Sequence, residues 1–368
     1  MTPRASLPTA RLACASGRPW VDLLRLCLAQ LDGLTDADDL GFVFMGDPVT
    51  DHADTILDQL VAATGIGRWV GAGGVGLFCG GRELEQGGAL AVATLSMPER
   101  RLHLVQGEKA ARRGAGDGRA ILHLPCDHVT SATGRWDLGS IGGRLSSGFD
   151  AAQIAGGRCH AGVSGIRFEA DTPFVAGLMH GTRPLGGWRP VTSSLGGRLL
   201  EIEGRPAAAV VAEEIGEVLA RQPSLVCRRI LIEVAGAGET GPEGPPTVER
   251  GRPVLVEGFD RASGEILCAT ERIGRWVRLA LRDATTAAAE MQEVGARLRG
   301  SFTRAMPPRL AIYHACRRRG PELFGSGVSE AALLQAALGP VPCIGLRTEG
   351  ELYEGALTSG AGVLALIG

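Results

Sequence analysis

The sequence contains no apolar run that approaches the roughly 18 to 20 residues of a membrane-spanning helix. Residues 1–17 also lack the uninterrupted apolar stretch of a signal peptide. Neither sign of charge prevails, because 38 basic residues stand against 40 acidic ones and the formal net charge is −2. A chain without a basic field does not collect polyanions. We therefore expect a cytoplasmic protein that enters no membrane and binds no nucleic acid.

Paired cysteine motifs are also missing, although the chain has nine cysteines. The cysteines are scattered, no two form a C-x-x-C motif, and most are therefore expected to be buried thiols. The nearest approach to a metal set is Cys126 and His128 in PCDHV together with Cys159 and His160 in RCHAG. Zinc sites draw on tighter, paired spacings. We expect no metal.

A glycine-rich segment, RWVGAGGVG at residues 68–76, has the spacing of the dinucleotide fingerprint G-x-G-x-x-G. That fingerprint requires a helix after the glycines and an acidic residue about 20 positions further on. Four more glycines follow instead, and no Asp or Glu lies between Glu85 and Glu99. The glycines are expected to lie between strands, where they allow close approach of the backbone to another group.

The first half of the chain alternates helical and strand patterns. Apolar residues at helical spacing follow Pro19, which suits a first helical turn, and Thr50 or Asp51 is placed to cap a later helix. The pattern predicts helices over 19–31 and 51–64 and strands over 40–46, 68–72, 89–97 and 101–106.

The second half repeats this alternation. A helix is expected over 205–223, between two prolines, and a Gly/Pro/Glu loop over 236–246. Asp283 and Ser329 are placed to cap two further helices. The pattern predicts helices over 284–300 and 330–339 and strands over 197–204, 308–316, 341–346 and 361–367.

The order of helix and strand in the last third echoes that of residues 40–97, which predicts two related domains. The fold class expected is α/β (mixed α+β), with a mixed β-sheet flanked by helices in each domain. We place an N-terminal helical extension at 1–37 and the two domains at 38–204 and 205–368. Residues 107–186 are rich in Gly, Ser and Arg, and their pattern places few elements.

Motifs from both halves resemble those of one family. They are LGFVFMG, VGAGGVG and GRELEQGGALAV in the first half, RPLGGWRPVTSSLGGRLLEIEGRPA at the junction, and LRDA (281–284), ACRRRGPELFG (315–325) and TEGEL (348–352) in the second. Together, over about residues 40–365, they are similar to the FIST family. This is a bacterial sensory pair in which a FIST N domain precedes a FIST C domain, and it also occurs in an F-box ubiquitin-ligase subunit.

The chain departs from the family pattern in three places. Arg318 stands where the family commonly has Gly, Leu346 and Arg347 stand where aromatic residues are usual, and ALTSGAG lacks the usual polar pair. All three departures fall around the pocket that the resemblance implies.

The resemblance implies a sensory protein that binds a small molecule, such as an amino acid, and signals through a separate protein partner. A guanidinium can hold a carboxylate through two parallel hydrogen bonds, and a carboxylate can accept from an ammonium group. We expect the ligand between the two halves, since clefts between domains are common sites. The predicted ligand-binding residues are Arg183, Gly186, Cys316, Arg319, Gly350 and Glu351.

Structural alternatives exist for the charged residues. Arg282 and Asp283 can form an ion pair at a helix start, and Arg319 can form an interdomain salt bridge with Glu351. Cys316 can be a buried thiol.

Two other functions remain open. Cys316 with His314, two residues away on one strand face, is the one hint of a cysteine-dependent enzyme. A branch of the FIST family binds haem and senses nitric oxide, which requires an axial ligand such as histidine. We expect no cofactor, because none of the histidines matches a motif of that branch: His52, His103, His123, His128, His160, His180 and His314.

Overall fold

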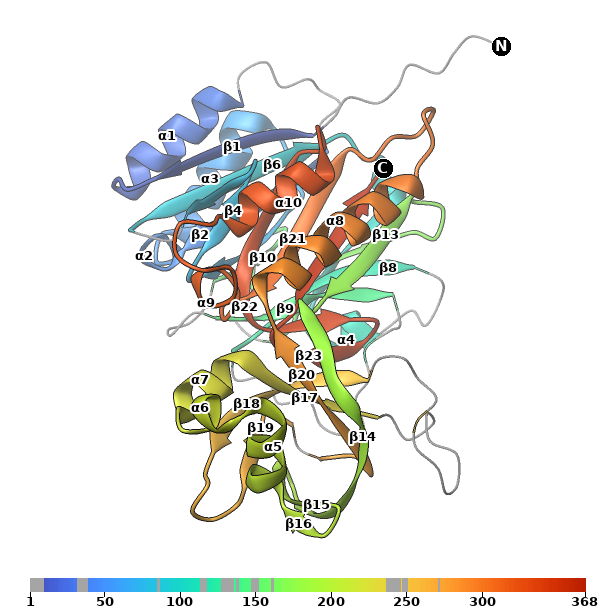
Figure 1. The fold of residues 1–368 in the computed structure, drawn as a ribbon. Helices are drawn as coiled ribbons and strands as arrows, with labels where there is room; N and C mark the ends of the chain where they lie inside the picture. Colours follow the sequence, from blue (N-terminus) through green and yellow to red (C-terminus); the bar gives the residue numbers. More distant parts are fainter. Residues whose placement is uncertain are drawn as a thin grey trace.

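The computed structural model describes most of the chain (Figure 1). The described residues are 10–31, 39–84, 87–112, 118–126, 136, 139–146, 152–159, 162–235, 246, 251–270 and 272–368. Their fold is a mixture of helices and mixed β-sheets, which confirms the predicted fold class.

The first sheet has six strands in the order β1-β6-β2-β3-β10-β11, and β2 and β3 run parallel. The strands are β1 (Arg11–Ser16), β2 (Leu40–Gly46), β3 (Trp69–Gly74), β6 (Ala89–Leu95), β10 (Gln153–Ala155) and β11 (Arg158–Cys159). Three helices accompany them: α1 (Trp20–Gln30), α2 (Asp47–Thr50) and α3 (Ala53–Thr64).

The second sheet has eleven strands, eight of them in the order β13-β24-β21-β22-β9-β8-β12-β7. The strands are β4 (Leu77–Cys79), β5 (Arg82–Leu84), β7 (Leu102–Gln106), β8 (Arg119–Leu124), β9 (Ser140–Leu145), β12 (Ser164–Phe168), β13 (Phe174–Met179), β21 (Leu310–Cys316), β22 (Cys343–Tyr353), β23 (Ala356–Thr358) and β24 (Gly362–Ile367). The helical segments around it are η1 (Glu99–Arg101), α4 (Glu108–Arg112), α8 (Ala284–Gly300), α9 (Pro321–Phe324) and α10 (Glu330–Leu338).

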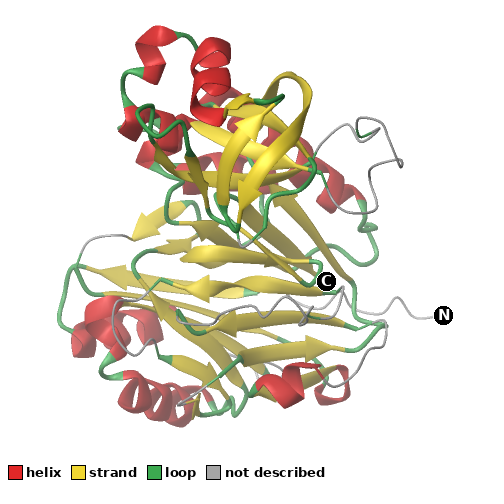
Figure 2. Cartoon of the chain, turned by 90° about the horizontal axis from the view of Figure 1, so that it is seen from below, coloured by secondary structure: helices red, strands yellow, loops and turns green. Residues whose placement is uncertain are grey.

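Alternation along the strands packs the two sheets face to face between outer helices. On β2, Phe42 and Phe44 point into a core shared with Ile312 of β21, whereas Val43 packs on the side of α1 and α3. On β21, Tyr313 packs on the side of α8 and α10. The result is four layers, helix, sheet, sheet and helix, and Figure 2 shows strands layered between helices.

The two halves of this sandwich repeat one topology. Strands β1, β2, β3 and β6, with α1 and α3 between them, lie in the spatial order β1-β6-β2-β3. Strands β13, β21, β22 and β24, with α8 and α10 between them, lie in the order β13-β24-β21-β22. The parallel pair β2–β3 corresponds to the parallel pair β21–β22. The structure thus confirms the echo that the sequence predicted between the two halves.

A third sheet is inserted into the second repeat, between β13 and α8. It has seven strands in the order β14-β20-β17-β18-β19-β15-β16 and forms the lower lobe in Figure 1. Its elements are β14 (Thr182–Leu195), β15 (Arg198–Ile202), β16 (Arg205–Pro206), α5 (Ala207–Ile215), α6 (Glu217–Ala220), α7 (Pro223–Arg229), β17 (Ile230–Val234), β18 (Arg252–Phe259), β19 (Ile266–Cys268) and β20 (Trp276–Arg282).

The sheets do not divide where the sequence placed its domain boundary. The inserted sheet runs across residues 204 and 205, and β4 and β9 of the first half pair with β22 of the second. The extension at 1–37 contains α1 as expected and also β1, which completes an edge of the first sheet. Strand pairing alone does not define domain limits, so the predicted ranges 38–204 and 205–368 stay a prediction.

The structure confirms two predicted helix caps, but a third cap and one predicted continuous helix are wrong. The Asp283 and Ser329 side chains cap α8 and α10, accepting from Thr286 N at 2.8 Å and Ala332 N at 3.2 Å. Neither Thr50 nor Asp51 caps α3, which begins after His52. The predicted helix over 205–223 is broken at Gly216, whose φ of 84° lies outside the helical range. Residues 236–245 of the predicted loop lie outside the described residues.

The glycine-rich segment is a strand of the sandwich. Gly71 lies in β3, and a Cβ there would meet the Val43 carbonyl oxygen of β2 at 1.7 Å. At Gly73 a Cβ would meet Thr50 Cγ2 at 2.3 Å. The segment continues into strand β4 rather than a helix. This confirms the interpretation that close backbone approach explains these glycines.

Candidate functional site

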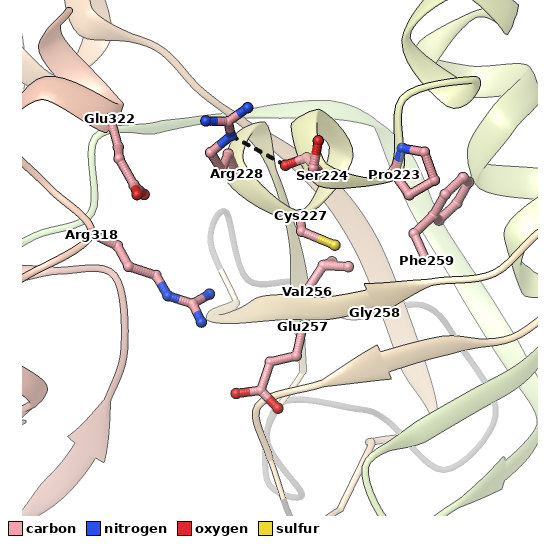
Figure 3. A pocket seen from close by; sticks show the side chains of 10 residues that line it. All are labelled: Pro223, Ser224, Cys227, Arg228, Val256, Glu257, Gly258, Phe259, Arg318 and Glu322. Carbon is pink, nitrogen blue, oxygen red and sulfur yellow. Dashed lines mark hydrogen bonds between the residues drawn. The ribbon is translucent and has the colours of Figure 1, made fainter.

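A pocket of about 620 Å³ lies where the inserted sheet meets the segment that follows β21 (Figure 3). One wall comes from α7 and β18 of the insert, and the other from the loop and helix α9 after Cys316. The lining residues are Pro223, Ser224, Cys227, Arg228, Val256, Glu257, Gly258, Phe259, Arg318 and Glu322. The site therefore joins two parts of the chain that are far apart in sequence.

The pocket presents both signs of charge over an apolar floor. Arg318 reaches from the sandwich side toward Cys227 and Val256 (Figure 3). Within the described part of the chain, no hydrogen bond or ion pair engages the Arg318 side chain. Val256 is buried, whereas Glu257 and Glu322 are exposed, and their carboxylates have no ion pair with any residue that the structure describes. Such a pocket suits a small molecule that carries both charges.

Arg282 positions the wall that carries Arg318. Its guanidinium Nη2 donates to the Arg318 carbonyl oxygen at 3.1 Å, and the side chain is almost fully buried. The predicted ion pair between Arg282 and Asp283 is wrong. Asp283 instead lies 3.5 Å from Arg183, because Asp283 turns outward to cap α8 while Arg282 turns inward.

Behind the pocket wall, Arg319 belongs to a buried ion network centred on Glu330. The Glu330 carboxylate accepts from Arg319 Nε, from the Tyr313 hydroxyl at 2.8 Å and from Arg347 Nη1 at 3.1 Å. Arg347 also donates to Glu83 at 2.6 Å. Both Arg319 and Glu330 are 0% exposed. The alternative of a salt bridge between Arg319 and Glu351 is wrong, because Glu330 at the start of α10 occupies the Arg319 guanidinium.

Glu351 is enclosed nearby, on β22. Its oxygens accept from the Thr348 hydroxyl at 2.9 Å and from Ala361 N at 3.1 Å. Burial raises the pKa of Glu351 to about 8, against the smaller opposing effects of these hydrogen bonds and of Arg319 and Arg282. The neighbouring Gly350 lies in β22 beside an irregularity of its ladder with β9, and a Cβ there would lie 3.2 Å from the Thr358 carbonyl oxygen.

The structure brings some of the six predicted ligand-binding residues together and separates others. Cys316, Arg319 and Glu351 are buried behind the wall formed by Arg318, and Glu351 interacts electrostatically with each of the other two. Arg183 is half-exposed on β14. Gly186 has a φ of 63° and faces Glu214 of α5, where a Cβ would meet the carboxylate oxygen at 2.2 Å. Their role in binding stays a prediction.

Cys316 lacks the surroundings of a nucleophile. Burial and the charge of Glu351 raise the pKa of its thiol to about 12. His314 lies in the central layer, with Nε2 at 3.3 Å from Nε2 of His123, and burial and His123 lower the pKa of His314 well below its ordinary value. The predicted alternative of a buried thiol is thus confirmed for Cys316.

The metal set considered from the sequence falls partly outside the described residues, which leave out His128 and His160. Among the residues that the structure does describe, no group of three or more His, Cys, Asp or Glu side chains could hold a metal ion. In the same part of the chain, no helix has the length and apolar character needed to cross a membrane.

Comparison with known families identifies the first half of the chain. Residues 39–205 match the family model described as the FIST N domain. The chain contains a FIST N domain. A comparison with curated proteins gives no match. FIST domains are small-ligand sensory domains, so the match indicates a small-ligand sensory domain in this part of the chain. The FIST C domain predicted beyond residue 205 stays a prediction.

Sequence reasoning missed most of this FIST protein's pocket. Its residues from the insert, such as Cys227 and Phe259, belong to segments with no recognisable motif. One signal did point to the site: Arg318, which lines the pocket, stands where the family commonly has Gly.

Replacing Glu351 with glutamine is expected to change how stability depends on pH. The exposed carboxyl of an unfolded chain titrates near pH 4.3, whereas the folded protein retains this proton until about pH 8. Between these values the folded state binds more protons than the unfolded state, so the free energy of unfolding falls as pH rises.

Glu351→Gln should reduce this decrease in the free energy of unfolding. Urea unfolding near pH 5 and near pH 8 measures it, with Glu349→Gln on the same strand, 30% exposed, as the control. Equal pH dependence in the wild type and both variants would contradict the expectation.

Proposed function

We propose that this FIST protein is a non-catalytic sensory protein that binds a zwitterionic small molecule, such as an amino acid, between the inserted sheet and α9. The single observation that carries the proposal is a pocket in which the Arg318 guanidinium lies near the carboxylates of Glu257 and Glu322 from both walls, none of which has a hydrogen bond or ion pair among the described residues. A change in the pocket would be passed to a separate signalling protein in the cytoplasm.

The dimensions of the pocket support this proposal. About 620 Å³ lies within the range of roughly 300 to 1,000 Å³ that small-molecule sites occupy. The pocket also lies between two structural units, a common location for such sites. A ligand that contacts both walls would favour one spacing of the insert and the sandwich, which gives binding a structural consequence.

The charges support a ligand with one anionic and one cationic group. Arg318 and Arg228 can donate paired hydrogen bonds to a carboxylate. Arg228 keeps its terminal nitrogens for this purpose, because its one hydrogen bond within the described residues runs from Nε to the Ser224 carbonyl oxygen, at 3.3 Å. Glu257 and Glu322 can accept from an ammonium group, and Phe259 and Val256 offer apolar surface to a side chain.

No cofactor enters the proposal. Haem needs an axial ligand on the wall of an apolar cavity, and none of the ten residues that line this pocket is a histidine. No covalent step is assigned to the pocket either, because burial raises the pKa of Cys227 despite the opposing charge of Arg318.

A thermal-shift panel of amino acids tests the proposal. A ligand at about 100 times its Kd adds about 2.7 kcal/mol to the free energy of unfolding. Replacing Arg318 with alanine removes a charge-assisted contact of about 1.5–3 kcal/mol, so the ligand should bind about 10-fold to 150-fold more weakly.

Arg317→Ala is the matched control, because Arg317 is the preceding residue, is 52% exposed and pairs with Glu349 outside the pocket. This variant should bind like the wild type. A panel without any shift, or equal loss of affinity in both variants, would contradict the proposed site.

A further inference from the structure

Two cysteines that are distant in sequence meet at an edge of the central core. Cys14 lies on β1, the edge strand of the first sheet, and Cys79 lies at the end of β4. Both side chains pack at the same core cluster between the sheets. The Cys79 thiol donates to the Ala13 carbonyl oxygen at 3.8 Å, beside Cys14. Arg82, which pairs with Cys79 across the β4–β5 ladder, also contacts the Cys14 sulfur.

The two sulfurs differ in their exposure and in the pKa of their thiols, so they differ in expected reactivity. Cys14 is half-buried and receives a hydrogen bond from Arg82 Nη1 at 3.9 Å, whereas Cys79 is 3% exposed. The neighbouring Cys79 side chain, together with the charge of Arg82, lowers the pKa of Cys14 to about 7 despite its partial burial. The same partnership and burial raise the pKa of Cys79. Cys14 is thus the accessible thiolate and Cys79 the enclosed thiol.

The backbone holds Cys14 in place. At the edge of the sheet, Cys14 N donates to Gln30 Oε1 and Gln30 Nε2 donates to the Cys14 carbonyl oxygen, both at 3.0 Å. The Gln30 side chain thus makes the two backbone hydrogen bonds that a neighbouring strand would otherwise make. This clamp keeps the Cys14 sulfur near both Arg82 and Cys79.

We propose that Cys14 and Cys79 form a redox site, in which a hydroperoxide oxidises Cys14 and Cys79 then closes a reversible disulfide. The proposal rests on the meeting of these two thiols beside a guanidinium, and it is independent of the ligand pocket. It assigns a function to two of the nine cysteines that the sequence treats as scattered thiols.

The chemistry balances in two steps. The Cys14 thiolate attacks one oxygen of hydrogen peroxide, the O–O bond breaks, and the leaving hydroxide takes a proton to become water while Cys14 becomes a sulfenic acid. The Cys79 sulfur then attacks the Cys14 sulfur and forms the S–S bond. The S–O bond breaks, and the sulfenic hydroxyl group leaves with the Cys79 proton as the second water. Two thiols lose two electrons, and one peroxide gains them.

Peptide mapping after peroxide treatment tests the proposal on the full-length protein. Trypsin cleaves after Arg11 and Arg25 but not between Arg18 and Pro19, so it releases Cys14 in peptide 12–25 and Cys79 in peptide 69–82, each with one cysteine. Brief treatment with equimolar hydrogen peroxide, followed by blocking of free thiols, should yield the disulfide-linked pair of these peptides. Dithiothreitol should then restore both thiols.

Single variants separate the roles of the two residues. Cys79→Ser should stop at the Cys14 sulfenic acid, which dimedone traps, whereas Cys14→Ser should lose the reaction at Cys79 altogether. Arg82→Gln should slow oxidation of Cys14 several-fold, and Cys227→Ser, which removes another partly exposed cysteine, should react like the wild type. Oxidation of Cys126, Cys159 and Cys227 without the 14–79 link, or equal labelling of Cys79 in Cys14→Ser, would overturn the proposal.

Discussion

Replacing Glu330 with alanine is expected to lower the free energy of unfolding by about 3–5 kcal/mol, the cost of removing one partner of a buried ion network. Arg319 would lose its only carboxylate partner within the described residues while remaining fully enclosed, and Arg347 and the Tyr313 hydroxyl would each lose an acceptor. A buried guanidinium without a counter-charge cannot be solvated at that depth. Urea unfolding of the two proteins measures the difference.

An exposed ion pair offers the contrast. Glu213 pairs with Arg205 on the surface of the insert, where the side chains are 63% and 49% exposed. Solvent screens such a pair, so Glu213→Ala should leave the free energy of unfolding almost unchanged. If both substitutions had the same small effect, the network around Glu330 would not stabilise the second half of the sandwich.

Replacing Gly71 with alanine is expected to destabilise the protein by about 1–3 kcal/mol or more, because the added methyl group has no room. Its Cβ would lie 1.7 Å from the Val43 carbonyl oxygen, and a backbone atom of the central parallel pair β2–β3 cannot move away as a flexible side chain can. Thermal or urea unfolding measures the loss.

Gly67 is the matched control for Gly71. It lies in the loop just before β3, and no atom lies within 4 Å of the Cβ that alanine would add. Gly67→Ala should therefore leave stability near that of the wild type or raise it slightly, since alanine reduces the entropy of the unfolded chain. Equal effects of the two substitutions would contradict the role of close backbone approach in the glycine-rich strand.

Local chemistry made several elements predictable from sequence. Asp283 and Ser329 cap helices because their side chains reach the amides three residues on, which depends on nothing distant. Strands β2 and β21 are runs of apolar residues, buried on both faces, and their pattern shows this directly. The repeated order of elements followed from these local signals.

The remaining features depend on contacts between distant segments. Strand β1 went unpredicted because its hydrogen-bonding partner, β6, lies far along the chain. No spacing rule could bring Arg318 to Cys227, or Cys14 to Cys79, since the intervening chain folds into other elements. Arg319 is predicted from the sequence to bind a ligand, but it pairs with Glu330 at the start of α10, and no local pattern indicates that pairing.

Hydrogen–deuterium exchange with and without the best ligand of the amino-acid panel tests the proposed site most directly. We expect slower exchange at 223–228, 256–259 and 318–322 when ligand is bound, because these segments form the two walls of the pocket. Slower exchange confined to other segments, with these three unchanged, would contradict the site.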